Sequence, residues 1–150
     1  MSESILVHEH LYDAKGQITK TVDFGVRLET TLRTTIPPEG VRFDFHWNAE
    51  ATGPKLKGKM EGTTYGYTRA DGLASVEWRG VLTTPEGDRI AVEGDAVTVR
   101  QGESPIFQQR ETVRFHTASP NYSWVNRVSV VGVNKIDLST GRFEMQGYEA

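Results

Sequence analysis

An amide stands among aromatic and β-branched side chains in SPNYSWVNRVSVVGV, residues 119–133. Read as a strand, this stretch puts Tyr122, Trp124 and Asn126 on one side together with two valines. A buried amide without a partner costs about 1–3 kcal/mol, so its presence needs a reason. Asn126 either bonds a neighbouring strand or a bulge, or it lines a pocket mouth in which aromatic rings hold a flat apolar ligand. The alternate residues form a second, partly apolar row, and both interpretations stay open.

The pocket interpretation predicts specific site residues within this stretch. We expect Tyr122, Trp124, Asn126 and Arg127 to bind the ligand. Tyr122 and Asn126 are also predicted to take part in catalysis, because a phenol and an amide can move or hold a proton or a polar group of a substrate.

The stretch HEH at residues 8–10 has the spacing of a metal site. His8 and His10 are two residues apart, so on a strand both project from one face, as two ligands of a metal ion would. Asp13 follows, as in the H-x-H and carboxylate pattern of cupins, but the upstream glycine of that pattern is missing. Further ligands would have to come from His46 or His116. Two surface histidines near a terminus are the favoured interpretation, so we predict no metal and no cofactor.

Glu9 lies between these histidines, on the face of Ile5, Val7 and Leu11. Burial on an apolar stripe favours the protonated form of a carboxylate and suits it to general acid–base work. The alternative is a charge that keeps an exposed sheet edge from pairing with another chain. Glu9 and His10 are therefore predicted as catalytic residues, with this alternative left open.

Other charged residues are expected on the wet side of strands. Glu93 and Asp95 share one face two residues apart. Arg110 and Glu111 precede the strand that holds Val113, and we expect them to form a surface pair.

Several catalytic motifs are missing from the chain. It has no G-x-S-x-G nucleophile elbow, P-loop, dinucleotide fingerprint or H-E-x-x-H. The groups that remain available for catalysis are the side chains of Tyr, His, Asp, Glu, Arg and Asn around an apolar cavity. They suit cofactor-free isomerisation, cyclisation or elimination on a hydrophobic substrate.

Strands must position these groups, because the apolar residues alternate with period two. In VRFDFHW, residues 41–47, the apolar side chains face one way and the polar ones the other, and TVDFGVRLETTL, residues 21–32, continues the pattern. Turn signals rich in Gly, Pro, Asn and Asp separate such runs at short intervals. About nine strands therefore predict an all-β fold, a single antiparallel meander β-barrel, with a two-sheet sandwich as the alternative. Trp47 and Trp78, on the apolar rows, are predicted to line the ligand cavity.

Composition limits the classes of protein and partner. The 150 residues predict one domain, 1–150, and the absence of cysteine excludes disulfides and thiolate chemistry. The net charge of −3 and scattered Lys and Arg predict no nucleic-acid partner. No segment approaches the ~20 apolar residues of a membrane span, and no signal peptide is recognisable, so a cytoplasmic location is expected. Exposed aromatic residues and sheet edges would also allow a homodimer.

The C-terminal part of the chain resembles a family of small β-barrel proteins known only as a domain of unknown function. The resemblance rests on the motif Y-x-W-[LV]-N-R, matched by residues 122–127, and on the strand with glycine that follows. GPKLKG (53–58), RADG (69–72) and EGDRI (86–90) match more loosely. The family implies a lipocalin-like closed barrel with an inner cavity and implies no established reaction.

Together these observations predict a protein that binds a small hydrophobic molecule, of aromatic, polyketide or terpenoid type. Its barrel would act as a cofactor-free isomerase or cyclase with acid–base residues at the mouth. A non-catalytic carrier with the same cavity is one alternative. A cupin-like metal enzyme that uses His8 and His10 is the other.

Overall fold

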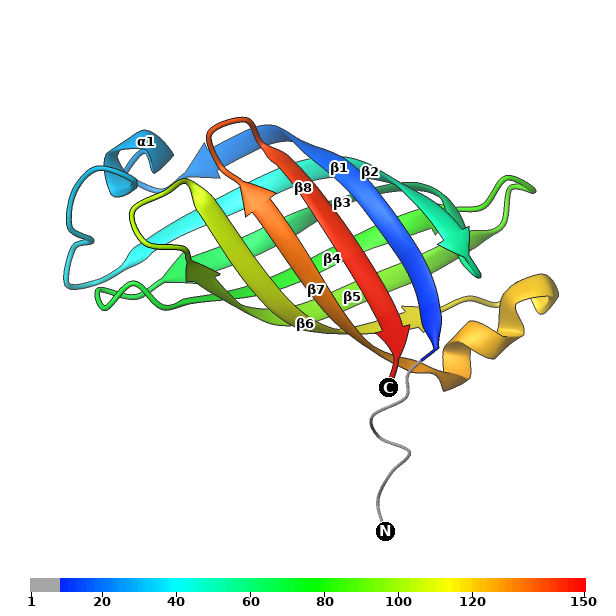
Figure 1. Cartoon of the computed structure of the whole chain (residues 1–150). Helices are drawn as coiled ribbons and strands as arrows, with labels where there is room; N and C mark the ends of the chain where they lie inside the picture. Colours follow the sequence, from blue (N-terminus) through cyan, green and yellow to red (C-terminus); the bar gives the residue numbers. More distant parts are fainter. Residues whose placement is uncertain (1–8) are drawn as a thin grey trace, which may run out of the picture.

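The chain forms a closed barrel of antiparallel strands that follow one another in sequence order (Figure 1). The computed structural model describes residues 9–150. The strands are β1 (His10–Asp23), β2 (Val41–Pro54), β3 (Lys57–Thr68), β4 (Ala74–Thr83), β5 (Arg89–Arg100), β6 (Ile106–His116), β7 (Ser129–Asp137) and β8 (Arg142–Glu149). Each pairs with the next, and β1 pairs with β8 to close the barrel. The predicted meander barrel is confirmed, with eight strands within residues 9–150 in place of about nine.

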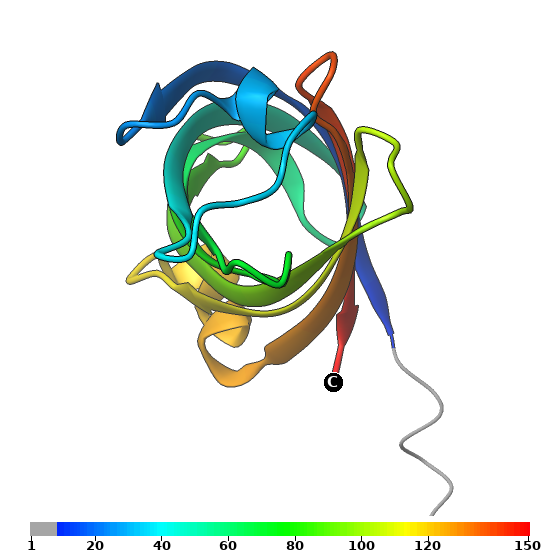
Figure 2. The ribbon, with the colours of Figure 1, turned by 90° about the vertical axis from the view of Figure 1, so that its left-hand side faces the viewer.

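The strand expected over residues 21–32 ends early. β1 stops at Asp23, and Gly25 has a φ of 109°, which glycine adopts without strain. The short helix α1 (Leu28–Thr31) follows, and the chain then runs to the start of β2. Figure 2 looks at this end of the barrel and shows α1 and the residues after it crossing the opening. Beyond Asp23 the period-two pattern was therefore wrong as a sign of strand. Residues 24–40, which we call the lid, cross the opening, and Leu28 and Leu32 line the cavity from there, whereas Phe24 is exposed.

The expectation of a strand from residue 119 onward is also wrong in its first half. Residues Pro120–Arg127 form a 3-10 helix, η2, and strand β7 begins only at Ser129. Proline stands in the first turn of η2, where its missing N–H has no helical partner to lose. Val125 from η2 is fully buried, so the helix covers the barrel end opposite to α1.

Packing inside the barrel is dense in the half near η2. Buried residues there include Leu56, Leu82, Ile90 and Val113, which belong to one hydrophobic cluster. Such inward residues alternate with exposed ones along β5 and β6, as expected for strands of a closed barrel.

Trp78 shows how the strands accommodate large rings in this interior. Its neighbour across the β4–β5 pair is Gly94, and a Cβ at that position would collide with the indole. Trp47 packs edge-on against Trp78, with ring centroids 5.7 Å apart, and against Phe143 at 5.8 Å. These three rings lie where the packed half of the barrel meets a hollow half.

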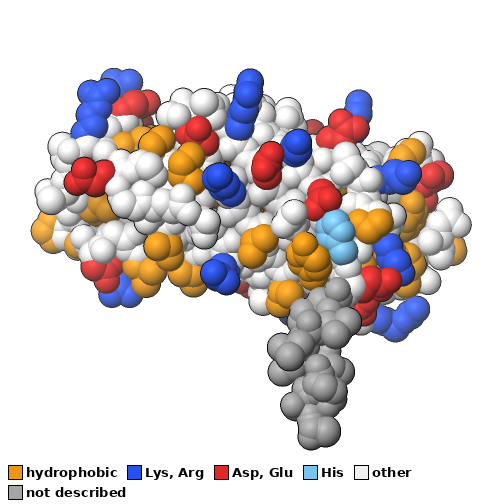
Figure 3. Space-filling view, in the orientation of Figure 1, with side chains coloured by type: hydrophobic (Ala, Val, Ile, Leu, Met, Phe, Trp, Pro, Cys, Tyr) orange, Lys and Arg blue, Asp and Glu red, His pale blue; other side chains and the backbone are white. Residues whose placement is uncertain are grey.

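The outer surface carries mixed charges. Figure 3 shows acidic and basic side chains interspersed with hydrophobic ones on the face it presents. Exposed apolar side chains include Tyr65, Tyr67, Val97 and Val133. Within residues 9–150, no helix has the length and apolar character needed to cross a membrane.

Candidate functional site

A cavity of about 580 Å³ occupies the barrel half under α1. This volume falls in the range of small-molecule sites, about 300–1,000 Å³. Aromatic and aliphatic side chains make most of the wall, since alternate residues of all eight strands point inward. The aromatic members are Phe43, Phe45, Trp47, Trp78, Phe107 and Phe143.

A chain of polar side chains crosses the cavity floor. Thr98 donates its hydroxyl proton to Gln109 Oε1 at 3.1 Å, and Gln109 Nε2 donates to Glu111 Oε1 at 2.8 Å. Trp78 Nε1 donates to the same Oε1 at 3.1 Å. Thr98, Gln109 and Trp78 line the cavity, whereas Glu111 lies one layer beneath them.

Glu111 corrects the expectation of a surface pair with Arg110. β6 begins at Ile106, so Glu111 belongs to the inward row with Gln109 and Val113 and is only 5% exposed. The signal was present in the sequence, because stepping back by twos from Val113 reaches both polar residues. A carboxylate and an amide on an inward row are costly unless they bond each other, as they do here.

Burial raises the pKa of Glu111, and its two hydrogen bonds from Gln109 and Trp78 only partly counter this. No salt-bridge partner of Glu111 is present in the part of the chain that the structure describes. Because Oε1 accepts both N–H groups, a proton taken up by this carboxyl would belong on Oε2. That oxygen packs against Gly132, and a Cβ on Gly132 would lie 3.1 Å from it.

Two further buried polar atoms have no partner in the described part of the chain, one near Glu111 and one on the cavity wall. Tyr12 Oη and Asn134 Oδ1, like Glu111 Oε2, have no hydrogen-bond partner among residues 9–150. Burial, and then the charge of Glu111, raises the pKa of Tyr12 far above its usual range. Asn134 pairs with Gln109 across β6 and β7 and lines the cavity. The floor is therefore polar and lacks a compensating cation.

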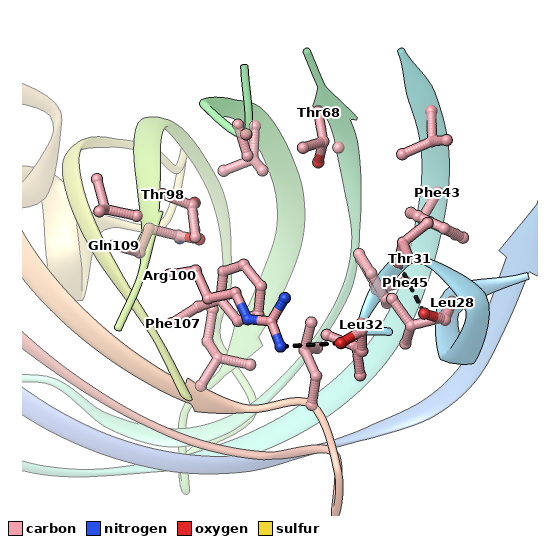
Figure 4. Close-up of a pocket in the computed structure, with 18 of the residues that line it drawn as sticks. Leu28, Thr31, Leu32, Phe43, Phe45, Thr68, Thr98, Arg100, Phe107 and Gln109 are labelled. Carbon is pink, nitrogen blue, oxygen red and sulfur yellow. Dashed lines mark hydrogen bonds between the residues drawn. The ribbon is translucent and has the colours of Figure 1, made fainter. Parts of the chain in front are cut away.

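Arg100 is the basic residue of the cavity wall and lies at the mouth (Figure 4). Its Nε donates to Ser104 O at 2.8 Å, and its Nη2 donates to Glu103 O at 2.7 Å. Nη2 also donates to Leu32 O at 3.1 Å, which ties the lid segment to β5. The guanidinium lies over the Phe107 ring, 5.9 Å from its centroid.

Trp47 and Trp78 are the two predicted ligand-binding residues that the fold brings to the cavity wall. Trp47 Nε1 donates to Thr64 Oγ1 at 3.0 Å, and Trp78 Nε1 donates to Glu111, so both indoles are fixed in orientation. Ligand binding by these two residues stays a prediction.

The predicted residues of the Y-x-W-V-N-R motif lie in η2, away from the cavity wall. Asn126 bonds both backbone groups of Thr117, accepting from its N–H at 2.8 Å and donating to its carbonyl at 2.8 Å. This is the backbone-bonding alternative of the two that the sequence left open. Tyr122 donates to Glu86 Oε1 at 2.9 Å, and Trp124 packs partly buried on the core. Arg127 is exposed at the end of η2.

The predicted residues near the N-terminus lie at the same end of the barrel as η2. His10 Nε2 is 2.9 Å from Asp13 Oδ1, and its ring stacks on Tyr148. Glu9 is exposed and pairs with Lys55 at 2.6 Å. His8 lies outside the described residues. No group of three or more metal-ligating side chains gathers within residues 9–150. Catalytic roles for Glu9, His10, Tyr122 and Asn126 stay predictions.

Solved structures share this fold over nearly the whole chain. A protein of unknown function from Clostridium acetobutylicum superposes with a TM-score of 0.78 at 17% identity, covering 95% of each chain. A β-barrel-like protein from Acinetobacter baumannii gives 0.73 at 19% identity, covering 95% of this chain and 94% of that one. An enzyme from Penicillium herquei gives 0.64 at 18% identity, with the same coverage. At these identities the likeness concerns the fold alone.

Comparison with curated proteins found no match. A sequence profile does match, over residues 9–150, which spans the whole barrel, and its description is "Protein of unknown function (DUF3237)". The predicted resemblance to a family of small barrels known only as a domain of unknown function is thereby confirmed, and the chain belongs to the DUF3237 family.

Proposed function

We propose that the protein binds one small, largely apolar molecule in the cavity between the lid and the tryptophan layer. The observation that carries this proposal is a hollow of about 580 Å³ walled by six aromatic rings in an otherwise packed barrel. Apolar walls with a few oriented polar groups are typical of sites for small organic ligands. Aromatic edges and faces favour a flat, unsaturated ligand body.

Gly66 offers a direct test of binding. It lies on the cavity wall in β3 with ordinary φ, and a Cβ there would meet its nearest neighbour at 3.5 Å. Gly66→Leu should therefore extend a side chain into the hollow without backbone strain, and Gly66→Ala should fill it only slightly. We expect the affinity for the neutral dye N-phenyl-1-naphthylamine to fall slightly for Ala and strongly for Leu. Equal affinities in all three proteins would refute the cavity as the binding site.

Cofactor-free catalysis is the second candidate function, and the polar floor favours it. Gln109 is held from both sides by Thr98 and Glu111, which leaves one amide N–H for a substrate oxygen. A fixed donor in an apolar site stabilises the developing charge of an enolate or alkoxide. Glu111 then acts as a positioning residue and holds a proton beneath the floor. The enzyme from Penicillium herquei shares the fold and supports this candidate as an analogy.

Catalysis and simple carriage differ in what happens to a bound molecule. Native mass spectrometry of protein from its own host should detect a small molecule bound to one barrel. Incubation of that molecule with the protein then decides between the two functions. A new product that requires Gln109 supports an isomerase or cyclase, whereas a molecule recovered unchanged supports a carrier. A protein that carries nothing and takes up no apolar dye would overturn both.

A further inference from the structure

We infer that the ligand carries an oxyanion, such as a carboxylate or phenolate, and that Arg100 binds it at the cavity mouth. This inference rests on the proposed binding function and specifies its ligand class. It starts from the charges on the wall. Among the described residues that line the cavity, only Arg100 and Asp71 carry a formal charge at neutral pH. Asp71 is already paired with Arg69, with Nη2 2.8 Å from Oδ2.

Arg100 has no such partner within the described part of the chain. Its hydrogen bonds all go to backbone carbonyls, those of Ser104, Glu103 and Leu32. Carbonyl dipoles solvate a guanidinium but do not cancel its unit charge. A guanidinium stays protonated in proteins, so the cavity holds one uncompensated positive charge at every physiological pH.

The hydrogen bonds also leave part of the guanidinium free. They use Nε and Nη2, and Nη1 has no acceptor among residues 9–150. Figure 4 shows the guanidinium reaching from β5 into the space between Phe107 and the lid residue Leu32. Charge-assisted bonds from arginine to an oxyanion are among the strong polar contacts in proteins.

The same geometry sets the orientation of the ligand. The oxyanion would lie under the lid, next to Nη1, and the apolar body would extend toward Trp47 and Trp78 on the floor. Because Nη2 keeps its bond to Leu32, the lid and the anion would share one side chain. A neutral apolar ligand of the same shape would fill the hollow but leave the positive charge of Arg100 without a counterion.

Two fluorescent dyes with one body test the inference. 8-Anilinonaphthalene-1-sulfonate and N-phenyl-1-naphthylamine differ by a single sulfonate. In Arg100→Gln we expect the affinity for the sulfonate to fall about tenfold or more, the effect of losing a charge-assisted bond. The affinity for the neutral dye should change by less than about threefold. Arg33→Gln is the matched control, because Arg33 is an exposed lid cation that does not line the cavity.

A second measurement uses the unmodified protein, so it tests the inference even if Arg100→Gln does not fold. 2-Naphthoate and 2-naphthamide have nearly the same shape, and only the first is an anion. The naphthoate should displace N-phenyl-1-naphthylamine at a clearly lower concentration.

The outcomes separate the two proposals. If the neutral dye binds but naphthoate and naphthamide compete equally, the oxyanion inference fails and the apolar cavity stands. Equal losses for both dyes in Arg100→Gln would mean that Arg100 only holds the lid, which also refutes the inference. If neither dye binds the wild-type protein, the proposed function itself is refuted.

Discussion

Replacing Glu111 by glutamine is expected to change how the stability of the protein depends on pH. Burial raises the pKa of Glu111 in the folded protein above its ordinary value of 4.5. Well below pH 4.5 the carboxyl of Glu111 is protonated in both the folded and the unfolded state, so it does not make the free energy of unfolding depend on pH. Between 4.5 and the raised pKa only the unfolded chain releases the proton, so the free energy of unfolding falls as the pH rises.

The structure sets the size of the effect. Within this pH window the buried carboxyl lowers the free energy of unfolding by about 1.4 kcal/mol per pH unit. Glutamine does not titrate, and its Oε1 can still accept from Trp78 and Gln109. Its Nε2 would occupy the place of Glu111 Oε2, which has no partner in the described chain, at a pH-independent cost of about 1–3 kcal/mol. In acid, the free energy of unfolding of the variant should therefore be lower than that of wild type. The difference between the two should shrink as the pH rises, because only wild type is destabilised.

Urea unfolding followed by circular dichroism, at fixed ionic strength and half-unit steps of pH, measures this difference. Tyr12 does not interfere, because its raised pKa keeps the phenol protonated throughout. Glu93→Gln, at an exposed position on the neighbouring strand, gives the background for removing one carboxylate. A difference between Glu111→Gln and wild type that stays constant with pH would refute the buried, proton-retaining carboxyl.

Further predictions concern packing and the closed end of the barrel. Asn126→Ala should lower the free energy of unfolding by about 2 kcal/mol, since it removes two hydrogen bonds to Thr117 of about 1 kcal/mol each, with dye affinity unchanged. A thermal melt and a dye titration check both parts, and weaker dye binding in a folded variant would place Asn126 in the site after all. Tyr122→Phe removes one exposed hydrogen bond and should cost less than about 1 kcal/mol in the same melt. Gly94→Ala should destabilise by about 1–3 kcal/mol because the new methyl group overlaps the Trp78 indole, and tryptophan fluorescence would report the displaced ring. An unaltered spectrum and melting temperature would refute that packing.

The apolar periodicity was enough to predict an antiparallel meander, with the barrel favoured over the two-sheet sandwich. Alternation in residues 41–47 and in the later strands means that one face of each strand is buried, and glycine and proline turns join the strands in order. These are local features, so they can be read without tertiary contacts. The same periodicity placed Trp47 and Trp78 on inward rows. Extended from Val113 by two residues toward the N-terminus, it would also have placed Glu111 on an inward row.

Residues 24–40 and 119–127 could not be predicted in this way. Each contains apolar residues at alternate positions, yet one segment crosses the cavity mouth and the other forms η2. A segment that closes a barrel end also needs apolar residues on one side, so its pattern can match that of a strand. Asn126 could be assigned to Thr117 only once the β6–η2 connection was folded.

Local sequence pattern is sufficient for an all-β meander, its inward rows, the exclusion of cysteine chemistry and membership of the DUF3237 family. Which end of the barrel is hollow and which is packed depends on how rings from distant strands meet, so it followed from the three-dimensional structure. That structure also decided that Arg100 lies at the mouth and Glu111 beneath the floor. A local pattern fixes which side of a strand a residue faces, whereas the depth of that residue along the barrel depends on strand register and closure.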